Sequence, residues 1–321
     1  MSTPELLGEQ LYLIDDYDLG RAGRTGTAVL LGEKITLIET CASPSLPYIL
    51  KGLEALNVQL DDIAYIVVTH VHLDHAGAAG LLMEKCKNAK LIVHPRGARH
   101  LVDPTKLIQG AQAVYGEQFD SLFSPILPVS EERIITVQDG DTLEIGNNRT
   151  LTFYDTPGHA KHHLSIHDSL TNGIFTGDTI GIYYRELMDC NVEFYLPSTS
   201  PSQFDPEAML SSLHRIHALG VYHIYFGHYG KSSHVRGVCR QIENWLPHFV
   251  QTGKDVLAKE KDDKAAAAKI TEKLMSDIRT YLTEQGVPAS HMVYEILQLD
   301  MEVSAMGIVD YLVKAEAIEK A

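Results

Sequence analysis

Short apolar runs and amphipathic stretches alternate along the first half of the chain. The runs are rich in β-branched residues and predict strands at residues 11–15, 27–31, 35–40, 63–69 and 91–94. Between them, residues 45–56 and 76–86 carry apolar side chains at the spacing of one helix face. This order of elements predicts a mixed α/β domain built in layers.

The segment from residue 100 to about residue 128 interrupts the alternation. Asp103 precedes the stretch LIQGAQAVYG and is predicted to cap a helix there, so the segment is interpreted as a helical insertion over one face. Residues 133–177 then return to strands, namely RIITV, RTLTFYDT, HHLSIHD and GIFTG, separated by the turn signals DGD, GNN and TNG. They predict a second sheet that is mostly antiparallel.

The last part of the chain has a helical pattern throughout. A helix at 204–219, with Asp205 as its predicted cap, and a strand at 221–227 come first. Beyond them, amphipathic and Ala/Lys/Glu-rich stretches predict helices without a further strand. We therefore divide the chain into a domain of residues 1–231 and a helical C-terminal extension of residues 232–321, which would serve as a lid, a wall of the substrate pocket or a dimerisation surface.

Composition narrows the classes of function. The 321 residues are 45% hydrophobic, enough for one large core, and the formal net charge of −15 disfavours nucleic acid and anionic membrane as partners. A small-molecule substrate is therefore expected. No window approaches the roughly 18 uninterrupted apolar residues of a membrane span, and the first residues lack a basic segment leading into an apolar one. Four cysteines without CxxC spacing predict reduced thiols, and we expect a cytoplasmic protein.

Seven residues with metal-binding side chains lie in loops at the ends of predicted strands. In the run THVHLDH, His70 and His72 point to the same side of an extended segment, while Asp74 and His75 turn toward a neighbouring point. Three more follow apolar strands beside glycine: His159, Asp178 and His228. Imidazole and carboxylate are the usual ligands of zinc, manganese and iron, so this ordered set indicates a metal site.

The motif HVHLDH followed by TPGH, GDT and GHYG resembles the metallo-β-lactamase superfamily pattern HxHxDH…H…D…H. The resemblance spans roughly residues 10–230. It implies a four-layer αββα sandwich, with residues 1–231 as the catalytic domain and the site at one edge of the two sheets. It also implies two ligand sets joined by a bridging carboxylate: His70, His72 and His159 for the first metal, Asp74, His75 and His228 for the second, and Asp178 between them.

The bridging Asp178 is similar to the glyoxalase II, lactonase and phosphodiesterase branches rather than to true β-lactamases. The helical tail is similar to that of the quinolone-signal thioesterases. This resemblance implies a dinuclear-metal hydrolase in which two divalent ions, zinc as the first choice and iron or manganese as alternatives, hold a bridging hydroxide. A thioester or lactone is favoured over a phosphodiester, because no phosphate-cradling glycine loop or arginine cluster is visible.

Two residues are candidates for proton transfer. Asp74 is placed to orient the attacking water and carry its proton, and His163 would act as a donor or oxyanion contact, although it also fits as the start of a strand. Substrate contacts are predicted from tyrosines in the loops after the metal residues, where ordinary packing fits equally well: Tyr183, Tyr184, Tyr195 and Tyr229.

Three other functions stay open. A mononuclear-iron persulfide dioxygenase uses the same fold with fewer ligands, whereas the complement here is that of a two-metal site. A diiron flavoprotein fits less well, because His72 stands where glutamate is usual and no flavodoxin-like domain follows. The third is a regulatory or binding protein that retains a metal site, with a homodimer as one use of the helical tail.

Overall fold

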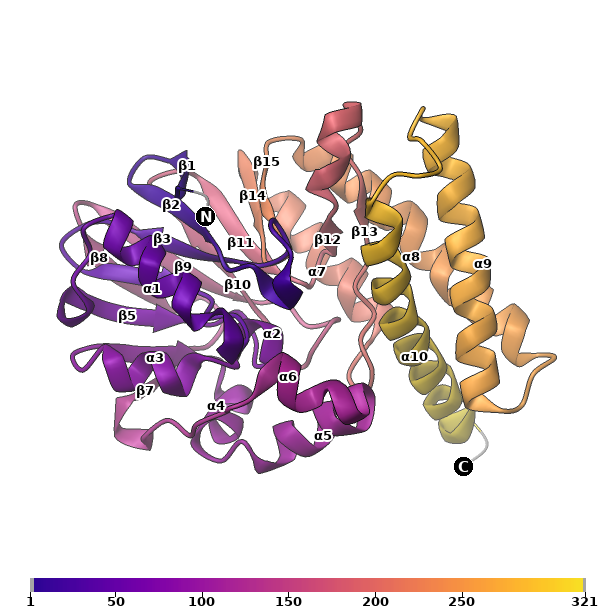
Figure 1. The fold of residues 1–321 in the computed structure, drawn as a ribbon, viewed down its shortest axis with the longest axis horizontal. Coiled ribbons are helices and arrows are strands. Elements are labelled where there is room, and N and C mark those ends of the chain that lie inside the picture. Colours follow the sequence, from indigo (N-terminus) through magenta and orange to yellow (C-terminus); the bar gives the residue numbers. More distant parts are fainter. Residues whose placement is uncertain (1–2, 320–321) are drawn as a thin grey trace. The chain divides into compact units, whose positions relative to one another are not determined.

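A computed structural model describes residues 3–319, and the chain separates into two compact units (Figure 1). The first runs to residue 156 and also contains His162–Gly177 and Val221–Ser233. The second contains Pro157–Lys161, Asp178–Gly220 and the chain from residue 234 onward. The second unit thus adds two segments to the helical tail. The predicted domain boundary between residues 231 and 232 stays a prediction.

The first unit is built on two sheets. The seven-stranded sheet has the strand order β1-β2-β3-β4-β5-β6-β7, and the six-stranded sheet has the order β15-β14-β11-β10-β9-β8. The strands of the first sheet are β1 Glu5–Gly8, β2 Leu11–Asp15, β3 Gly26–Leu30, β4 Ile35–Ile38, β5 Ile63–Val67, β6 Lys90–Val93 and β7 Ile134–Thr136. Those of the second are β8 Thr142–Gly146, β9 Arg149–Asp155, β10 Leu164–Asp168, β11 Gly173–Gly177, β14 His223–Phe226 and β15 Gly230–Ser232.

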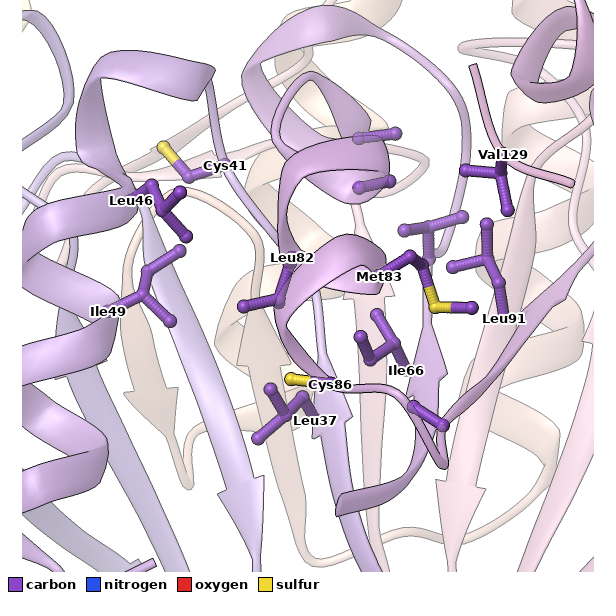
Figure 2. Close-up of a cluster of buried hydrophobic side chains, with 14 of the residues drawn as sticks. Leu37, Cys41, Leu46, Ile49, Ile66, Leu82, Met83, Cys86, Leu91 and Val129 are labelled. Carbon is purple, nitrogen blue, oxygen red and sulfur yellow. The ribbon is translucent and has the colours of Figure 1, made fainter. Parts of the chain in front are cut away.

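Strand alternation gives this unit two apolar layers. In β5 and β6, Ile66 and Leu91 face one cluster while their neighbours Val67 and Ile92 face another, because successive side chains point to opposite faces. The second cluster joins the sheets, since it includes Phe153 of β9. The first cluster joins the seven-stranded sheet to helices, and Figure 2 shows Ile66 and Leu91 with Met83 of the helix Ala79–Lys85.

The helices of the first unit follow the predicted pattern closely. They are α1 Leu46–Ala55, α2 Leu73–Ala76, α3 Ala79–Lys85, α4 Pro95–Val102, α5 Thr105–Tyr115 and α6 Phe119–Phe123. Short 3-10 turns are η1 Asp18–Gly20, η2 Ser43–Ser45, η3 Leu60–Asp62, η4 Gly116–Gln118 and η5 Glu131–Arg133. The predicted helix at 76–86 begins later, at Ala79, and the expected insertion at 100–128 is helical.

One strand assignment from the sequence is wrong. The run RIITV was placed in the second sheet, yet β7 pairs in parallel with β6 in the seven-stranded sheet. The helices α4 to α6 between them form the long crossover that a parallel pair requires. The second sheet is mostly antiparallel as predicted, and only its β11–β14 pair is parallel.

The second unit is mainly helical. Its helices are α7 Pro206–Ala218, α8 Val235–Leu257, α9 Asp263–Glu284 and α10 Val293–Glu319, with the 3-10 turn η6 Arg185–Cys190 and a hairpin of β12 Ile182–Tyr183 and β13 Tyr195–Leu196. The Asp205 carboxylate accepts from Ala208 N and caps α7 as predicted. Helices α8, α9 and α10 lie side by side around one apolar cluster that includes Phe249, Ile270 and Leu297 (Figure 1).

The predicted fold class is confirmed: a mixed α/β chain with two sheets and a helical C-terminal region. All four cysteines are free thiols, and three of them are buried. Among the described residues, no helix combines the length and the apolar character needed to cross a membrane.

Candidate metal centre

The buried carboxylate of Glu39 fixes the loop that follows β5. Glu39 follows β4 with a positive φ of 70°, and its carboxylate accepts from the backbone N–H and the hydroxyl of Thr69. Because the hydroxyl donates to Glu39, its oxygen accepts from Nδ1–H of His70 at 3.0 Å. This network leaves Nε2 of His70 with its lone pair directed away from Thr69, as a metal-binding nitrogen needs.

His72 completes the first pair of ring nitrogens. It precedes α2 with extended backbone angles, and its Nδ1 lies 3.1 Å from Nε2 of His70. In a tetrahedral site with metal–nitrogen distances of about 2.0–2.1 Å, two ligand nitrogens lie about 3.3 Å apart. The separation therefore fits two nitrogens that share one cation, as the extended spacing of the HxH motif predicts.

A second set lies in the same unit, where α2 meets the end of β14. Nε2 of His75 lies 3.2 Å from Nε2 of His228, and Oδ2 of Asp74 lies 3.3 Å from the same nitrogen of His228. The distance from Asp74 Oδ2 to His75 Nε2 is 3.7 Å. Three ligand atoms at these separations form one face of a coordination tetrahedron. The donor set of two imidazoles and a carboxylate suits zinc, manganese or iron.

His228 is held by groups from the segment before β3. Its Nδ1 lies 3.2 Å from the carbonyl oxygen of Arg24 and 3.1 Å from the Thr25 hydroxyl, which donates to the Asp18 carboxylate. A carbonyl can only accept, so Nδ1 carries the proton and Nε2 faces Asp74. Burial raises the pKa of Asp18, and the nearby Asp74 carboxylate raises it further.

The second unit holds the two remaining predicted ligand residues. Nε2 of His159 lies 3.7 Å from Oδ2 of Asp178, and both side chains are buried. Nδ1–H of His159 donates to the carbonyl oxygen of Ser198 at 3.0 Å, and the Ser198 hydroxyl donates to Asp178 at 3.3 Å. A single residue, Ser198, thus contacts both ligands.

Each unit therefore assembles part of the predicted set. The first brings together Asp74, His75 and His228 and places His70 against His72, while the second places His159 against Asp178. The predicted joining of all seven residues around two ions stays a prediction. Sequence reasoning missed the supporting residues Glu39, Thr25 and Ser198, because none of them belongs to the ligand motif.

The predicted catalytic and substrate residues outside this set are well packed. His163 directly precedes β10, is buried, and its Nδ1 lies 3.1 Å from the Thr156 hydroxyl. The four tyrosines are buried too. The rings of Tyr183 and Tyr195 pack at a tilt with their centroids 4.8 Å apart, Tyr184 donates to Asp300, and Tyr229 joins the cluster between the sheets. Their roles in catalysis and substrate contact stay predictions.

A further group of possible ligands lies in the second unit: Asp189, Cys190 and His291. Nδ1 of His291 accepts from the backbone N–H of Val293, so in the neutral ring Nε2 carries the proton and donates to the Asp189 carboxylate at 3.1 Å. A cation at Nε2 would require the opposite tautomer and would break the hydrogen bond to Val293. We therefore interpret these three residues as a hydrogen-bonded group at the N-terminus of α10 and not as a metal site.

Several known proteins are similar to parts of this chain in sequence. A protein of Sulfurisphaera tokodaii, the metallo-beta-lactamase fold-containing protein ST1585, is 30% identical over 191 residues, which cover 58% of this chain and 66% of that protein. The probable metallo-hydrolase MJ0888 of Methanocaldococcus jannaschii is 28% identical over 158 residues, 48% of this chain and 66% of that protein. The rubredoxin-oxygen oxidoreductase of Megalodesulfovibrio gigas is 29% identical over 141 residues, 44% of this chain and 29% of that protein.

A solved structure of ST1585 from Sulfolobus tokodaii extends the similarity to most of the chain. It superposes with a TM-score of 0.65 at 23% identity and covers 94% of this chain and 98% of that one. By sequence, this chain spans slightly less than two thirds of the first two relatives and under a third of the oxidoreductase. The sequence model of the metallo-beta-lactamase superfamily matches residues 22–228, and since this is more than half of the chain, the chain belongs to the metallo-beta-lactamase superfamily.

Proposed function

We propose that this protein is a metal-dependent hydrolase with two divalent ions, zinc as the first choice, held by the seven predicted ligands. The observation that carries the proposal is the set of Asp74, His75 and His228, whose ligand atoms lie 3.2–3.7 Å apart with Nδ1 of His228 already bonded elsewhere. The name of MJ0888, a probable metallo-hydrolase, supports the same class of reaction.

Different side chains would have different roles in hydrolysis. When bound, two divalent cations lower the pKa of water toward neutrality and polarise the scissile carbonyl. Asp74, whose side chain is 29% exposed, is the ligand carboxylate open to solvent and would orient the attacking water and accept its proton. Thr69 and Ser198 hold His70 and His159 in orientation through their Nδ1 atoms, so the ligands need not reorganise during the reaction.

For the substrate, we propose a small thioester or lactone, as in the glyoxalase II, lactonase and quinolone-signal thioesterase branches. The net charge of −15 opposes a polyanionic substrate. An oxygen-dependent reaction is the second candidate, favoured by the match to the rubredoxin-oxygen oxidoreductase. A cytoplasmic location and a homodimer through the helical tail stay predictions.

Metal content and hydrolysis together test this function. We expect about two ions per wild-type chain and hydrolysis of at least one member of a thioester and lactone panel. An Asp178→Ala variant should retain at most one ion and lose at least about 100-fold in hydrolysis, because it removes the bridging ligand. Asp277→Ala, a half-exposed carboxylate of the second unit, is the control and should match the wild type.

The other outcomes point to the competing functions. A single iron per chain, with oxygen consumed in the presence of a persulfide, would contradict the hydrolase and favour a persulfide dioxygenase. Two irons with oxygen reduction would favour chemistry like that of the oxidoreductase relative. A folded chain that binds no metal in elemental analysis would favour a regulatory protein.

The support of His228 gives a separate prediction. Thr25→Val removes the hydroxyl that lies between His228 and Asp18 while keeping the side-chain shape. Loss of such a supporting group should weaken metal binding about 10- to 100-fold, measured by competition with a chelator. Thr27→Val, two residues further along in β3, is a matched control, because the buried Thr27 hydroxyl bonds to Asp16 instead. Equal metal affinity in both variants would contradict the assigned role of Thr25.

A further inference from the structure

The loop after β13 connects two ligand residues of the second unit to the helical tail. Within it, the Ser198 carbonyl accepts from His159 and the Ser198 hydroxyl donates to Asp178. The Ser200 hydroxyl lies 3.4 Å from Nε2 of His159. The residue between them, Thr199, is fully buried and points the other way, donating from its hydroxyl to the carbonyl oxygen of Ser304 in α10 at 2.9 Å.

One turn further along α10, Gly307 lets the helix approach this loop. A Cβ atom at position 307 would overlap the carbonyl oxygen of Thr199 and lie 2.7 Å from the carbonyl carbon of Ser200. Real Cβ atoms essentially never approach other atoms closer than 3.0 Å. Both of these neighbours are backbone atoms, which cannot swing aside as a side chain would. Position 307 therefore requires glycine so that the loop can lie directly on the helix.

The turn that carries His159 is fixed on its other side by α7. The Ser212 hydroxyl donates to the carbonyl oxygen of Pro157 at 2.6 Å, and a Cβ at Gly158 would lie 2.5 Å from the backbone nitrogen of Met209. With the turn fixed there, the orientation of the His159 ring depends on the Ser198 carbonyl of the opposite loop. The loop depends in turn on α10.

We propose that α10 is a positioning element of the metal centre: through Gly307 and the Thr199–Ser304 hydrogen bond, it holds the loop that orients His159 and Asp178. This assignment rests on the proposed function, since it takes both residues as metal ligands. The helical tail would then build the site itself, whether or not it also serves as a lid or a dimer surface. Displacement of a ligand by about 1 Å is enough to impair a site that needs fixed geometry.

The test compares two glycine substitutions in the tail. Gly307→Ala forces the loop away from α10. Gly253→Ala inserts the same methyl group between α8 and α10, where its three nearest atoms belong to the side chains of Ile308 and Leu312. Metal-free protein is titrated with cobalt(II), and visible absorption reports affinity and coordination geometry. We expect Gly307→Ala to weaken at least one cobalt site about tenfold or more and to change the spectrum, while Gly253→Ala keeps the wild-type spectrum.

A second pair keeps the proposal testable if Gly307→Ala does not fold. Thr199→Val removes the hydroxyl that bonds to Ser304. Thr271→Val is the control: it removes a hydroxyl of α9 that lies 3.0 Å from the carbonyl oxygen of Ala267 in its own helix and 3.3 Å from that of Met301 in α10. Only Thr199→Val should alter cobalt binding, although both variants lower the melting temperature. Identical cobalt affinity and spectra in the members of both pairs would overturn the proposal.

The two proposals fail in different ways. If the wild-type protein binds no cobalt, the proposed function is contradicted. Hydrogen exchange of residues 157–161 in the metal-free chain then decides the positioning role, which requires faster exchange in Gly307→Ala than in Gly253→Ala. If the wild type binds two ions and Gly307→Ala binds them equally well with an unchanged spectrum, the proposed hydrolase function stands and the positioning role of α10 is contradicted.

Discussion

An Asp74→Asn variant should hydrolyse its best substrate about 10²- to 10⁴-fold more slowly than the wild type, with the loss in kcat, as expected when a proton-transferring group is removed. Asparagine keeps the size of aspartate and one acceptor oxygen, but its neutral amide cannot take a proton from water. Asp74 Oδ2 also lies 3.3 Å from His228 Nε2, so under the proposed function the variant also loses an anionic metal ligand.

Steady-state kinetics and metal analysis on the same samples separate these two effects. If excess metal restores occupancy but not kcat, proton transfer is the main role of Asp74; if it restores both, metal binding is. Asp155→Asn is the matched control, because Asp155 is a half-exposed carboxylate of the first unit that bonds to Nε2 of His94 at 2.9 Å. A kcat within tenfold of the wild type in metal-loaded Asp74→Asn would contradict the proposed role.

The ligand motif could be predicted because its information is local. His70 and His72 are two residues apart at the end of an apolar strand, and the alternation of an extended chain places them on one side. Asp74 and His75 follow within one turn, in α2. Of the residues in this set, only His228 is distant in sequence. It could still be found, because the glycine beside it indicated the end of the strand that became β14.

The groups that hold the ligands could not be predicted in this way. Thr25 lies 203 residues before His228, and neither its type nor its surroundings in sequence distinguish it from the neighbouring Thr27. Glu39 was visible only as the polar end of a predicted strand. Its φ of 70°, a backbone strain of about 1–3 kcal/mol, is set by the tertiary contacts that hold its carboxylate under Thr69.

The strand assignments failed for a similar reason. β1 and β8 were missed because each buries only one side chain and so lacks a clear apolar run. The prediction placed β7 in the wrong sheet because hydrophobic alternation reports which faces of a strand are buried but does not identify the partner strand. The partner is decided by the crossover of α4 to α6, which returns the chain in parallel to β6. Which strands pair depends on the whole sheet and cannot be inferred from the sequence of one strand.

Asp168→Ala should cost the folded protein about 3–5 kcal/mol, the largest stability loss that we predict, because it removes one partner of a fully buried ion pair. The Asp168 carboxylate receives Nε–H and Nη2–H of Arg149 at 2.8 and 2.7 Å, and both side chains have at most 1% of their surface exposed. The Thr171 hydroxyl donates to the same carboxylate at 2.6 Å. The variant leaves the guanidinium buried without its counter-charge.

Urea denaturation measures this loss, and two further variants identify its cause. Asp310→Ala removes a half-exposed partner of Lys314 on α10 and should cost only about 0.3–0.5 kcal/mol, since water screens that pair. Arg149→Met combined with Asp168→Leu removes both charges and should recover much of the stability. The larger part of the loss in Asp168→Ala comes from leaving the Arg149 charge buried without a partner, and the lost attraction contributes less. A loss below about 1 kcal/mol in Asp168→Ala would show that water or another group reaches Arg149 and that β9 and β10 do not depend on this pair.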